Sequence, residues 1–390
     1  RLGFNRLPRE IYLACGVAAA ISAGFNAPIA GIIFAHEAIL RHFSVRAIAP
    51  ITVSSIAASS VGGYLFPHTA AFKIVAAAPA LAEVVPFLVI LSPIFAITAI
   101  TFMVSIRYST KLATSLSVNP TLLPFIGATA CGLVGLFVPQ ALGLGVSNIN
   151  DMIAGEYLVP LLISVLIAKI FMTSACIGFG VFGGVFSPAL FIGVAAGALA
   201  TKLLVAIGFN DIASVITVAA MAAVSASVIG APLSAVLIVL ELSQSYEYAV
   251  AAMIAVMVCS PITHRLFGHS FFDRQLLDRG VDLVKGREAI ALENQVLEPY
   301  ASQDHIRVRK SDTGNTAREH MERREQTEAY VVDEGGILLG KLNIHQAVSC
   351  GDDTVDTRMD KDPTLLYADD SLKQAMIKVS NFVGESLPVV

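Results

Sequence analysis

The sequence predicts an all-α polytopic membrane domain with inverted repeats, the first of them incomplete, followed by α/β modules. Three observations predict it. Hydrophobic residues make up 55% of the 390 positions and charged residues only 14%, a balance more apolar than that of ordinary water-soluble chains. Residues 1–280 hold 13 Lys+Arg and 10 Asp+Glu, whereas the shorter remainder holds the other 13 and 20. A motif of the apolar part also occurs twice.

The apolar part contains stretches long enough to cross a bilayer, which takes about 20 residues in a helix. They are Val84–Val104, Leu158–Cys176 and Ala213–Glu241. A water-soluble helical protein would give such helices a polar face, and these stretches mostly lack one. The sequence therefore predicts several membrane-spanning helices.

The charge and the cysteines argue against several classes of partner. The net charge is −4 and no basic run is typical of nucleic-acid binding, so no nucleic acid is expected. The five cysteines stand singly, without the spacing of a zinc site or a disulfide framework. His36 and Glu37 match the start of a zinc-protease motif, but Leu40 stands where the second histidine is needed. No metal site is predicted.

A motif around Pro28 returns around Pro232. In both places an alanine precedes the proline, a small and apolar stretch follows, and a glutamate stands nine positions after the proline, at Glu37 and Glu241. Proline is favoured in the first turn of a helix, so each copy predicts a helix start. Two similar halves in one membrane domain are typical of transporters with internal repeats, in which the ion site lies near the midplane between the halves.

The two halves are unequal in length. The second half is expected to begin near Leu81, some 150 residues before its own Ala-Pro pair, whereas 26 residues precede Ala27. On the order of a hundred residues of the first repeat are therefore expected to lie outside this sequence.

Glycines interrupt the sequence where the helix over Leu158–Cys176 should continue, between residues 178 and 184. Irregular backbone at this depth is tolerated only where it is packed in protein or lines an aqueous cavity. Ser187 as N-cap and Pro188 at the first helical position are expected to start the next helix. Its free N–H groups and positive dipole end can hold an anion without a full positive charge. The alternative is that the paired glycines serve only close helix packing.

These residues resemble those of a known family, the CLC chloride channels and transporters. The resemblance rests on Phe25–Pro28 (Phe-Asn-Ala-Pro), on Lys169–Pro188, which ends in Gly-Gly-Val-Phe-Ser-Pro, and on the Ala-Pro helix ending at Glu241. It covers nearly all of residues 1–280 in order and spacing. It implies a homodimer, embedded in the lipid of the cell membrane as a multi-pass protein, with a separate pathway for chloride or a similar anion in each subunit.

The resemblance also assigns site residues. The central anion is expected on the backbone amides of Val185 and Phe186, next to Gly183 and Gly184. Phe272 falls at the place of the family's pore tyrosine; it keeps the ring but has no O–H to donate, so the anion is expected to be held less specifically. The family's Gly-Arg-Glu-Gly-Pro motif, which carries its gating glutamate, and its upstream selectivity serine do not occur in this chain.

Three further positions bear on ion movement. In exchangers of the family a glutamate relays protons; Ala38 occupies that position here, and Glu37 matches the acidic residue before it. Because alanine carries no proton, this favours a passive channel or an exchanger with another relay. Glu37 is expected either to assist proton uptake or to cap a helix end. Lys169, a cation deep in apolar sequence, is expected to bias the pathway toward anions, unless its side chain extends to the membrane surface instead.

The sequence after residue 280 is charged and mixed in pattern. A helix over Asn315–Arg324 and strands over Ala329–Val332 and Ile337–Leu342, joined by a turn, are predicted. This order resembles a CBS module. The expected divisions are a membrane domain over 1–280, a linker over 281–292, a first CBS module over 293–350 and an incomplete second one over 351–390.

Paired CBS modules often bind adenine nucleotides, so an adenine nucleotide is one expectation for the tail. The alternative is a tail that only packs and stabilises the dimer. No other cofactor is expected. Because the last membrane helix leads directly into it, the tail is expected in the cytoplasm.

Two interpretations compete with anion transport, one within transport and one from another class. A magnesium carrier with CBS modules needs several carboxylate ligands, for which ten acidic residues in 1–280 give thin support. An intramembrane enzyme needs a nucleophile with a base or a metal pair, and no such set is evident, so no enzyme is predicted. Transport of chloride or a similar anion is the prediction, with channel and proton-coupled exchanger both open.

Overall fold

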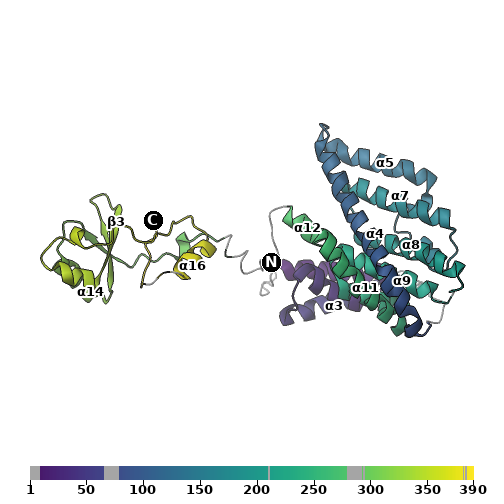
Figure 1. Cartoon of the computed structure of the whole chain (residues 1–390), viewed down its shortest axis with the longest axis horizontal. Helices are drawn as coiled ribbons and strands as arrows, with labels where there is room; N and C mark the ends of the chain where they lie inside the picture. Colours follow the sequence, from purple (N-terminus) through teal and green to yellow (C-terminus); the bar gives the residue numbers. More distant parts are fainter. Residues whose placement is uncertain are drawn as a thin grey trace. The chain divides into compact units, whose positions relative to one another are not determined.

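The structure is a computed structural model, and it describes residues 9–65, 79–209, 211–278, 292, 295–380, 382 and 384–390. The chain forms two compact units, Arg1–Gln275 and Leu276–Val390 (Figure 1). Each unit has its own core. The predicted linker, 281–292, lies almost entirely outside the described residues, and its bounds stay a prediction.

The described residues of the first unit form helices joined by turns and loops. Six of its helical stretches are long and apolar enough to cross a membrane: α3, α4, η2 with α5, α7, α8, and α11 with α12. The elements are α1 (Arg9–Phe25), α2 (Pro28–Phe34), the π-helical turn η1 (Ala35–Leu40), α3 (Val45–Leu65), α4 (Leu81–Ser115), η2 (Pro120–Leu122), α5 (Leu123–Phe137), η3 (Pro139–Ala141), α6 (Val146–Ile153), α7 (Val159–Gly178), α8 (Phe186–Ala206), α9 (Ala213–Ile229), α10 (Pro232–Ser243), α11 (Tyr246–Phe267) and α12 (Phe271–Leu277).

Two of the three predicted spanning stretches are confirmed, and the third is divided at the helix start predicted for Pro232. Val84–Val104 lies within α4, and α7 takes up Leu158–Cys176 apart from its first residue. The stretch Ala213–Glu241 is instead divided into α9 and α10, both shorter than a span. The division falls at Gly230, whose φ of +80° ends α9 in the left-handed region, where glycine is tolerated at little cost.

Helix α9 lies at the centre of the first unit. From Val215 to Ile229 every residue is buried, and α9 contacts α4, α8, α10 and α11. In Figure 1, α5, α7, α8 and α9 lie in a stack that α4 crosses, and contacts of α4 with α7, α8 and α9 agree with this arrangement. A helix apolar on all sides is therefore accommodated inside protein rather than against lipid.

Two glycines let α8 approach α9 closely. A Cβ on Gly193 would lie 2.7 Å from the Cα of Met221 and 2.8 Å from the carbonyl oxygen of Ala220. A Cβ on Gly197, one turn further, would lie 2.9 Å from the Cα of Thr217. Small residues four apart are a familiar contact pattern between membrane helices. They fix the position of α8, whose amino end is the candidate site.

The second unit has a mixed α/β fold around a three-stranded sheet of order β1-β2-β3. Strand β1 pairs with β2 in parallel, and β2 pairs with β3 antiparallel. The predicted helix and both predicted strands are confirmed within one residue at each end, whereas β1 was not predicted. The elements are η5 (Glu298–Tyr300), β1 (Ile306–Arg309), α14 (Gly314–Arg324), β2 (Glu328–Val332), β3 (Leu338–Asn343), α15 (Ile344–Cys350), η6 (Val355–Thr357) and α16 (Leu372–Ser380).

Candidate functional site

The predicted break between two membrane helices is present. Helix α7 ends at Gly178 and α8 begins at Phe186. The predicted start of α8 was wrong by two residues: Val185, not Ser187, is its N-cap, and no side chain caps it. Pro188 therefore stands third in the helix, which costs nothing because the N–H groups of the first turn have no intrahelical partner.

The main chain at this break offers unpaired N–H groups. In the described backbone, Val181 N donates to Cys176 O at 2.9 Å and Ala189 N donates to Val185 O at 3.0 Å, but no carbonyl partner is described for the amides of Gly183, Gly184 and Val185. Phe186 and Ser187, in the first turn of α8, lack intrahelical partners by position. A cluster of free donors at a helix amino end attracts an anion.

The two glycines of the break leave space beside these amides. Gly183 and Gly184 are exposed, and a Cβ at either would meet nothing within 4 Å. The side chain of Val185 is buried. The alternative that the paired glycines serve only close helix packing has no support in these contacts, because neither glycine approaches another helix.

Three aromatic rings meet at the amino end of α8. The ring centroid of Phe186 lies 5.3 Å from that of Phe25 and 5.7 Å from that of Phe34, both in edge-on contact. We call these three residues the aromatic cluster. It joins the Phe-Asn-Ala-Pro segment to the glycine-rich segment, an association that spacing along the chain could not predict. The phenylalanines inside both motifs were the available signal.

Glu37 caps the amino end of another helix. One carboxylate oxygen accepts a hydrogen bond from Leu233 N at 2.9 Å, and the other accepts from Ser234 N at 2.8 Å and from the Ser234 hydroxyl. Leu233 and Ser234 are the two residues after Pro232, at the start of α10. The carboxylate thus meets the positive end of that helix.

Glu241 makes the equivalent bonds in the opposite direction. Its two carboxylate oxygens accept from Ile29 N at 2.9 Å and Ala30 N at 2.7 Å, the two residues after Pro28 at the start of α2. Both predicted Ala-Pro helix starts are therefore confirmed, and the two copies of the repeated motif lie against each other. The sequence showed the repeat but not this reciprocal capping.

Ala38 lies in η1, partly buried against the main core. The residues beside it include a buried imidazole: His36 is 1% exposed, its Nδ1 lies 3.3 Å from His42 O, and its ring stacks on Phe43 at 5.3 Å between centroids. The proposed absence of a proton relay at position 38 stays a prediction.

Lys169 is buried within the protein, with 4% of its surface exposed. Its ammonium donates to Ala141 O at 2.9 Å and to Gly143 O at 2.7 Å, and lies 4.6 Å from the ring centroid of Phe191 on α8. The charge is thus held by two carbonyl dipoles and an aromatic face. Its effect on an anion pathway stays a prediction.

Phe272 stands second in α12 and is 36% exposed. Its described ring contact is with Phe271, at 5.4 Å between centroids, so the structure groups it with its neighbour rather than with the aromatic cluster. The start of α12 is held by Asp273, which accepts from the Ser270 hydroxyl at 2.7 Å and pairs with Arg41.

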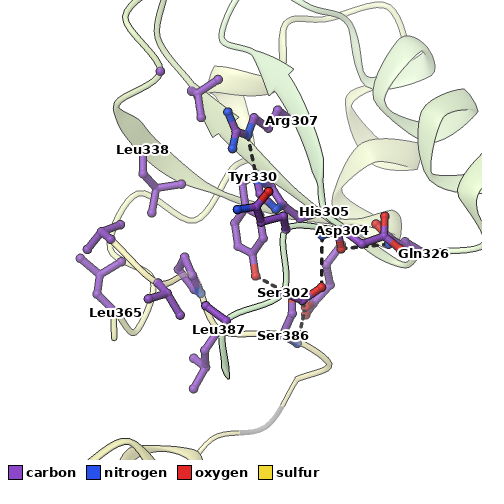
Figure 2. A pocket seen from close by; sticks show the side chains of 18 of the residues that line it. Ser302, Asp304, His305, Arg307, Gln326, Tyr330, Leu338, Leu365, Ser386 and Leu387 are labelled. Atoms are coloured by element: carbon purple, nitrogen blue, oxygen red, sulfur yellow. Dashed lines mark hydrogen bonds between the residues drawn. The ribbon is translucent and has the colours of Figure 1, made fainter. Parts of the chain in front are cut away.

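The second unit contains a cavity of about 950 Å³ beside β1 and β2 (Figure 2). His305 and Tyr330 lie with their rings edge-on at 5.8 Å, and Arg307 Nε donates to His305 Nε2 at 2.8 Å. The Tyr330 hydroxyl donates to Ser386 Oγ at 2.7 Å. Burial raises the pKa of Tyr330, so its hydroxyl stays protonated near neutral pH. Apolar side chains such as Leu387 complete the lining.

An ion pair adjoins this cavity. Lys341 Nζ lies 2.7 Å from Glu328 Oε2 and donates to Ser386 O at 2.6 Å, while Ser386 N donates to the same carboxylate at 2.8 Å. Burial raises the pKa of Glu328, but the hydrogen bonds from Lys341 and Ser386 outweigh it, so the net pKa lies below its ordinary value. The pair ties the 385–390 segment to the sheet.

A polytopic helical domain with a broken helix pair and a repeated motif defines a class of membrane transport proteins. The family described as voltage gated chloride channel matches residues 1–264, and this chain belongs to that family. It is therefore a multi-pass membrane protein.

Several curated relatives carry related names. The chain is 30% identical over 298 residues to the H(+)/Cl(-) exchange transporter ClcA of Vibrio parahaemolyticus, covering 74% of this chain and 63% of that protein. It is 26% identical over 268 residues to the voltage-gated ClC-type chloride channel ClcB of Escherichia coli, covering 67% and 64%. The chain thus spans less than two thirds of the length of these relatives.

Solved structures share the fold. A slow cyanobacterial Cl-/H+ antiporter superposes with a TM-score of 0.62 and 22% identity, covering 72% of this chain and 67% of that one. A eukaryotic CLC transporter superposes with a TM-score of 0.58 and 20% identity, covering 95% and 65%.

Proposed function

We propose that the chain belongs to a protein that carries chloride or a similar small anion across a membrane, with the anion held at the amino end of α8. The main observation behind this proposal is that the backbone amides of Gly183–Ser187 lack partners in the described backbone and lie beside glycines that leave open space. The names of the relatives, an exchange transporter and a channel, support the choice of chloride.

The chemistry of this site suits a transported ion. Amide dipoles and a helix amino end attract an anion through partial charges, so it binds moderately and can leave again. Val185 and Phe186 supply amides from within a helix that is anchored against α9. Phe272 supplies at most a ring edge, and Lys169 supplies a positive potential from a fixed position on α7.

The assembly and the location are proposed from the resemblance to the family. The complete protein is proposed to be a homodimer in the lipid of the cell membrane, with one pathway in each subunit and its second unit in the cytoplasm. The predicted CBS character of that unit is part of this proposal.

Channel and exchanger differ in whether protons move. The test is anion flux from liposomes that hold the complete protein, with and without a pH gradient. Proton movement driven by a chloride gradient decides for exchange, in which case a group other than Ala38 relays the proton; chloride flux without proton movement decides for a channel. The absence of any chloride flux, with the protein folded and inserted, would reject anion transport.

The cavity of the second unit supports a ligand proposal. Rings from His305 and Tyr330, apolar side chains and the guanidinium of Arg307 suit an adenine nucleotide. Four carboxylates also line the cavity, at Glu298, Asp304, Glu328 and Glu385; Glu328 is paired with Lys341, and Asp304 lies 3.8 Å from Arg324. Their charge disfavours three phosphates, so a monophosphate is proposed over a triphosphate.

Calorimetric titration of the complete protein with adenosine, AMP and ATP tests this ligand. AMP is expected to bind more tightly than ATP, and Arg307→Gln is expected to weaken AMP but not adenosine. If none of the three compounds produces heat of binding, the nucleotide proposal is rejected and the tail is assigned a role in packing only.

A further inference from the structure

Glu37 and Glu241 each cap the helix that carries the other glutamate. Each carboxylate accepts two backbone N–H groups from the first turn of the helix that carries the other carboxylate. Because each glutamate stands near the carboxyl end of its own helical segment, the segment 28–40 and α10 must run antiparallel. The two caps lie at opposite ends of the pair, about 13 Å apart for nine residues of helix.

Both caps suit a carboxylate. In each glutamate both oxygens act as acceptors of backbone N–H groups. A glutamine has the same shape but replaces one acceptor with an NH₂ donor. The substitution therefore removes at least one hydrogen bond and places an NH₂ donor against a backbone N–H donor.

The two caps break together. If the segment 28–40 slides along α10, Glu37 leaves the start of α10 and the start of α2 leaves Glu241 in the same movement. A pair held at both ends thus has one bonded arrangement and no half-bonded intermediate along that motion. This is the behaviour of a two-state contact rather than of two separate caps.

The segment that the caps hold also builds the candidate anion site. Phe34, on α2, contacts Phe186 at the amino end of α8, and Phe25, just before α2, contacts the same ring. Phe34 and Val185 belong to one buried core. The position of α2 therefore sets the position of the ring whose own amide is a proposed anion donor.

We propose that Glu37 and Glu241 are positioning residues that act as one charge-dependent clamp, fixing α2 against α10 and thereby the aromatic cluster at the anion site. This rests on the proposed function for the anion itself. The clamp uses the two copies of the repeated motif, and it assigns both repeated glutamates a shared role.

The test uses the complete protein with Glu37→Gln, Glu241→Gln and the double variant. Chloride affinity is measured by calorimetry, and the chloride concentration for half-maximal flux is measured in liposomes. Each single variant is expected to weaken chloride binding about five-fold or more, the low end of coupling between separate sites. The double variant is expected to lose little beyond either single one, because weakening either cap lets segment 28–40 slide along α10, and that movement breaks both caps.

Three controls separate positioning from general damage. Glu83→Gln alters an exposed carboxylate in the first turn of α4 and should leave chloride affinity unchanged. Glu241→Asp keeps the charge and should recover part of the affinity. Ser234→Ala removes one hydroxyl from the Glu37 cap while the two amide bonds remain, and should have a small effect.

Chloride affinity at the wild-type level in folded single variants would overturn the clamp, as would losses that add in the double variant. If the wild-type protein binds and carries no chloride, the proposed function fails instead. The clamp is then tested by comparing the thermal unfolding of the two single variants and the double variant. Losses of stability that add in the double variant reject the clamp, and losses that do not add support it.

Discussion

Lys169 illustrates how a single residue can serve structure and electrostatics together. Its ammonium donates to the carbonyl groups of Ala141, at the end of η3, and of Gly143, which follows η3, and it lies over Phe191. A buried charge is costly unless its hydrogen bonds are made. The lysine is therefore bound to the local fold whatever its effect on anions.

Replacement of Lys169 by Met is expected to lower the free energy of unfolding by about 1–3 kcal/mol, because the buried carbonyl of Ala141 loses its donor and the partly buried carbonyl of Gly143 loses one as well. Thermal unfolding in detergent measures this. Lys202→Met is the matched control, since Lys202 donates to one exposed carbonyl, that of Gly155. An equal loss in both variants would contradict the structural role of Lys169.

Phe272→Tyr tests the predicted weakness of the anion site. A hydroxyl on this exposed ring adds one donor, and chloride binding is expected to tighten by about five-fold, the value of one net hydrogen bond of about 1 kcal/mol. Calorimetry with chloride and bromide measures the change. Unchanged affinity and selectivity would count against a pore position for Phe272.

At the scale of elements, close approach of α8 to α9 positions the candidate site. Gly193 and Gly197 face the α9 backbone at distances that exclude any side chain. The four-residue spacing of these glycines was visible in the sequence, but its partner helix was not. The amino end of α8 is thus anchored by packing a few turns away.

Gly193→Val is expected to destabilise the first unit by about 3 kcal/mol or more, because the new methyl groups collide with backbone rather than with a side chain that can move. Gly132→Ala is the control: nothing lies within 4 Å of its Cβ position on α5, so stability should stay level or rise by up to about 1 kcal/mol. Thermal unfolding of both variants compares them. A stable, fully folded Gly193→Val protein would refute the close packing.

At the scale of the whole molecule, the two units respond to different conditions. The first buries apolar helices around α9, with few charges. The second holds a small sheet with the Glu328–Lys341 pair at its edge. Acid should therefore weaken the second unit through this pair.

The lowered pKa of the Glu328 carboxylate predicts that the second unit loses stability as the pH falls. Its pKa in the folded state lies below its ordinary value of 4.5, so its contribution to stability is present above that value. The contribution is lost as the pH falls through the lowered folded pKa. Hydrogen exchange of β2 and β3 in the intact protein, corrected for intrinsic rates, should show protection falling in that window.

The Glu328→Gln variant should show weaker protection of β2 and β3 from hydrogen exchange at neutral pH. Its protection should then fall less than that of the wild type when the pH is lowered. Glu319→Gln, which alters an exposed partner of Arg323 on α14, should keep the wild-type acid response. An identical acid response in Glu328→Gln and wild type would show that another group controls it.

The sequence by itself determined the membrane class, the two unlike parts, both Ala-Pro helix starts and the break before α8. Composition, hydrophobic length, proline and glycine act locally, so a linear pattern reveals them. It misplaced the N-cap of α8, because free N–H groups tolerate Pro188 at several first-turn positions. It also listed Ala213–Glu241 as one apolar stretch of spanning length, although the helix start predicted at Pro232 lies inside it, because hydrophobic length does not reveal the left-handed turn at Gly230.

Only the tertiary structure decided which distant groups meet. The aromatic cluster, the carbonyl partners of Lys169 and the reciprocal bonds of Glu37 and Glu241 join residues far apart in the chain. Such contacts depend on how helices pack, and packing is a property of whole surfaces rather than of any one motif. The repeated glutamates were visible as a pattern, but their pairing required two antiparallel helices in contact.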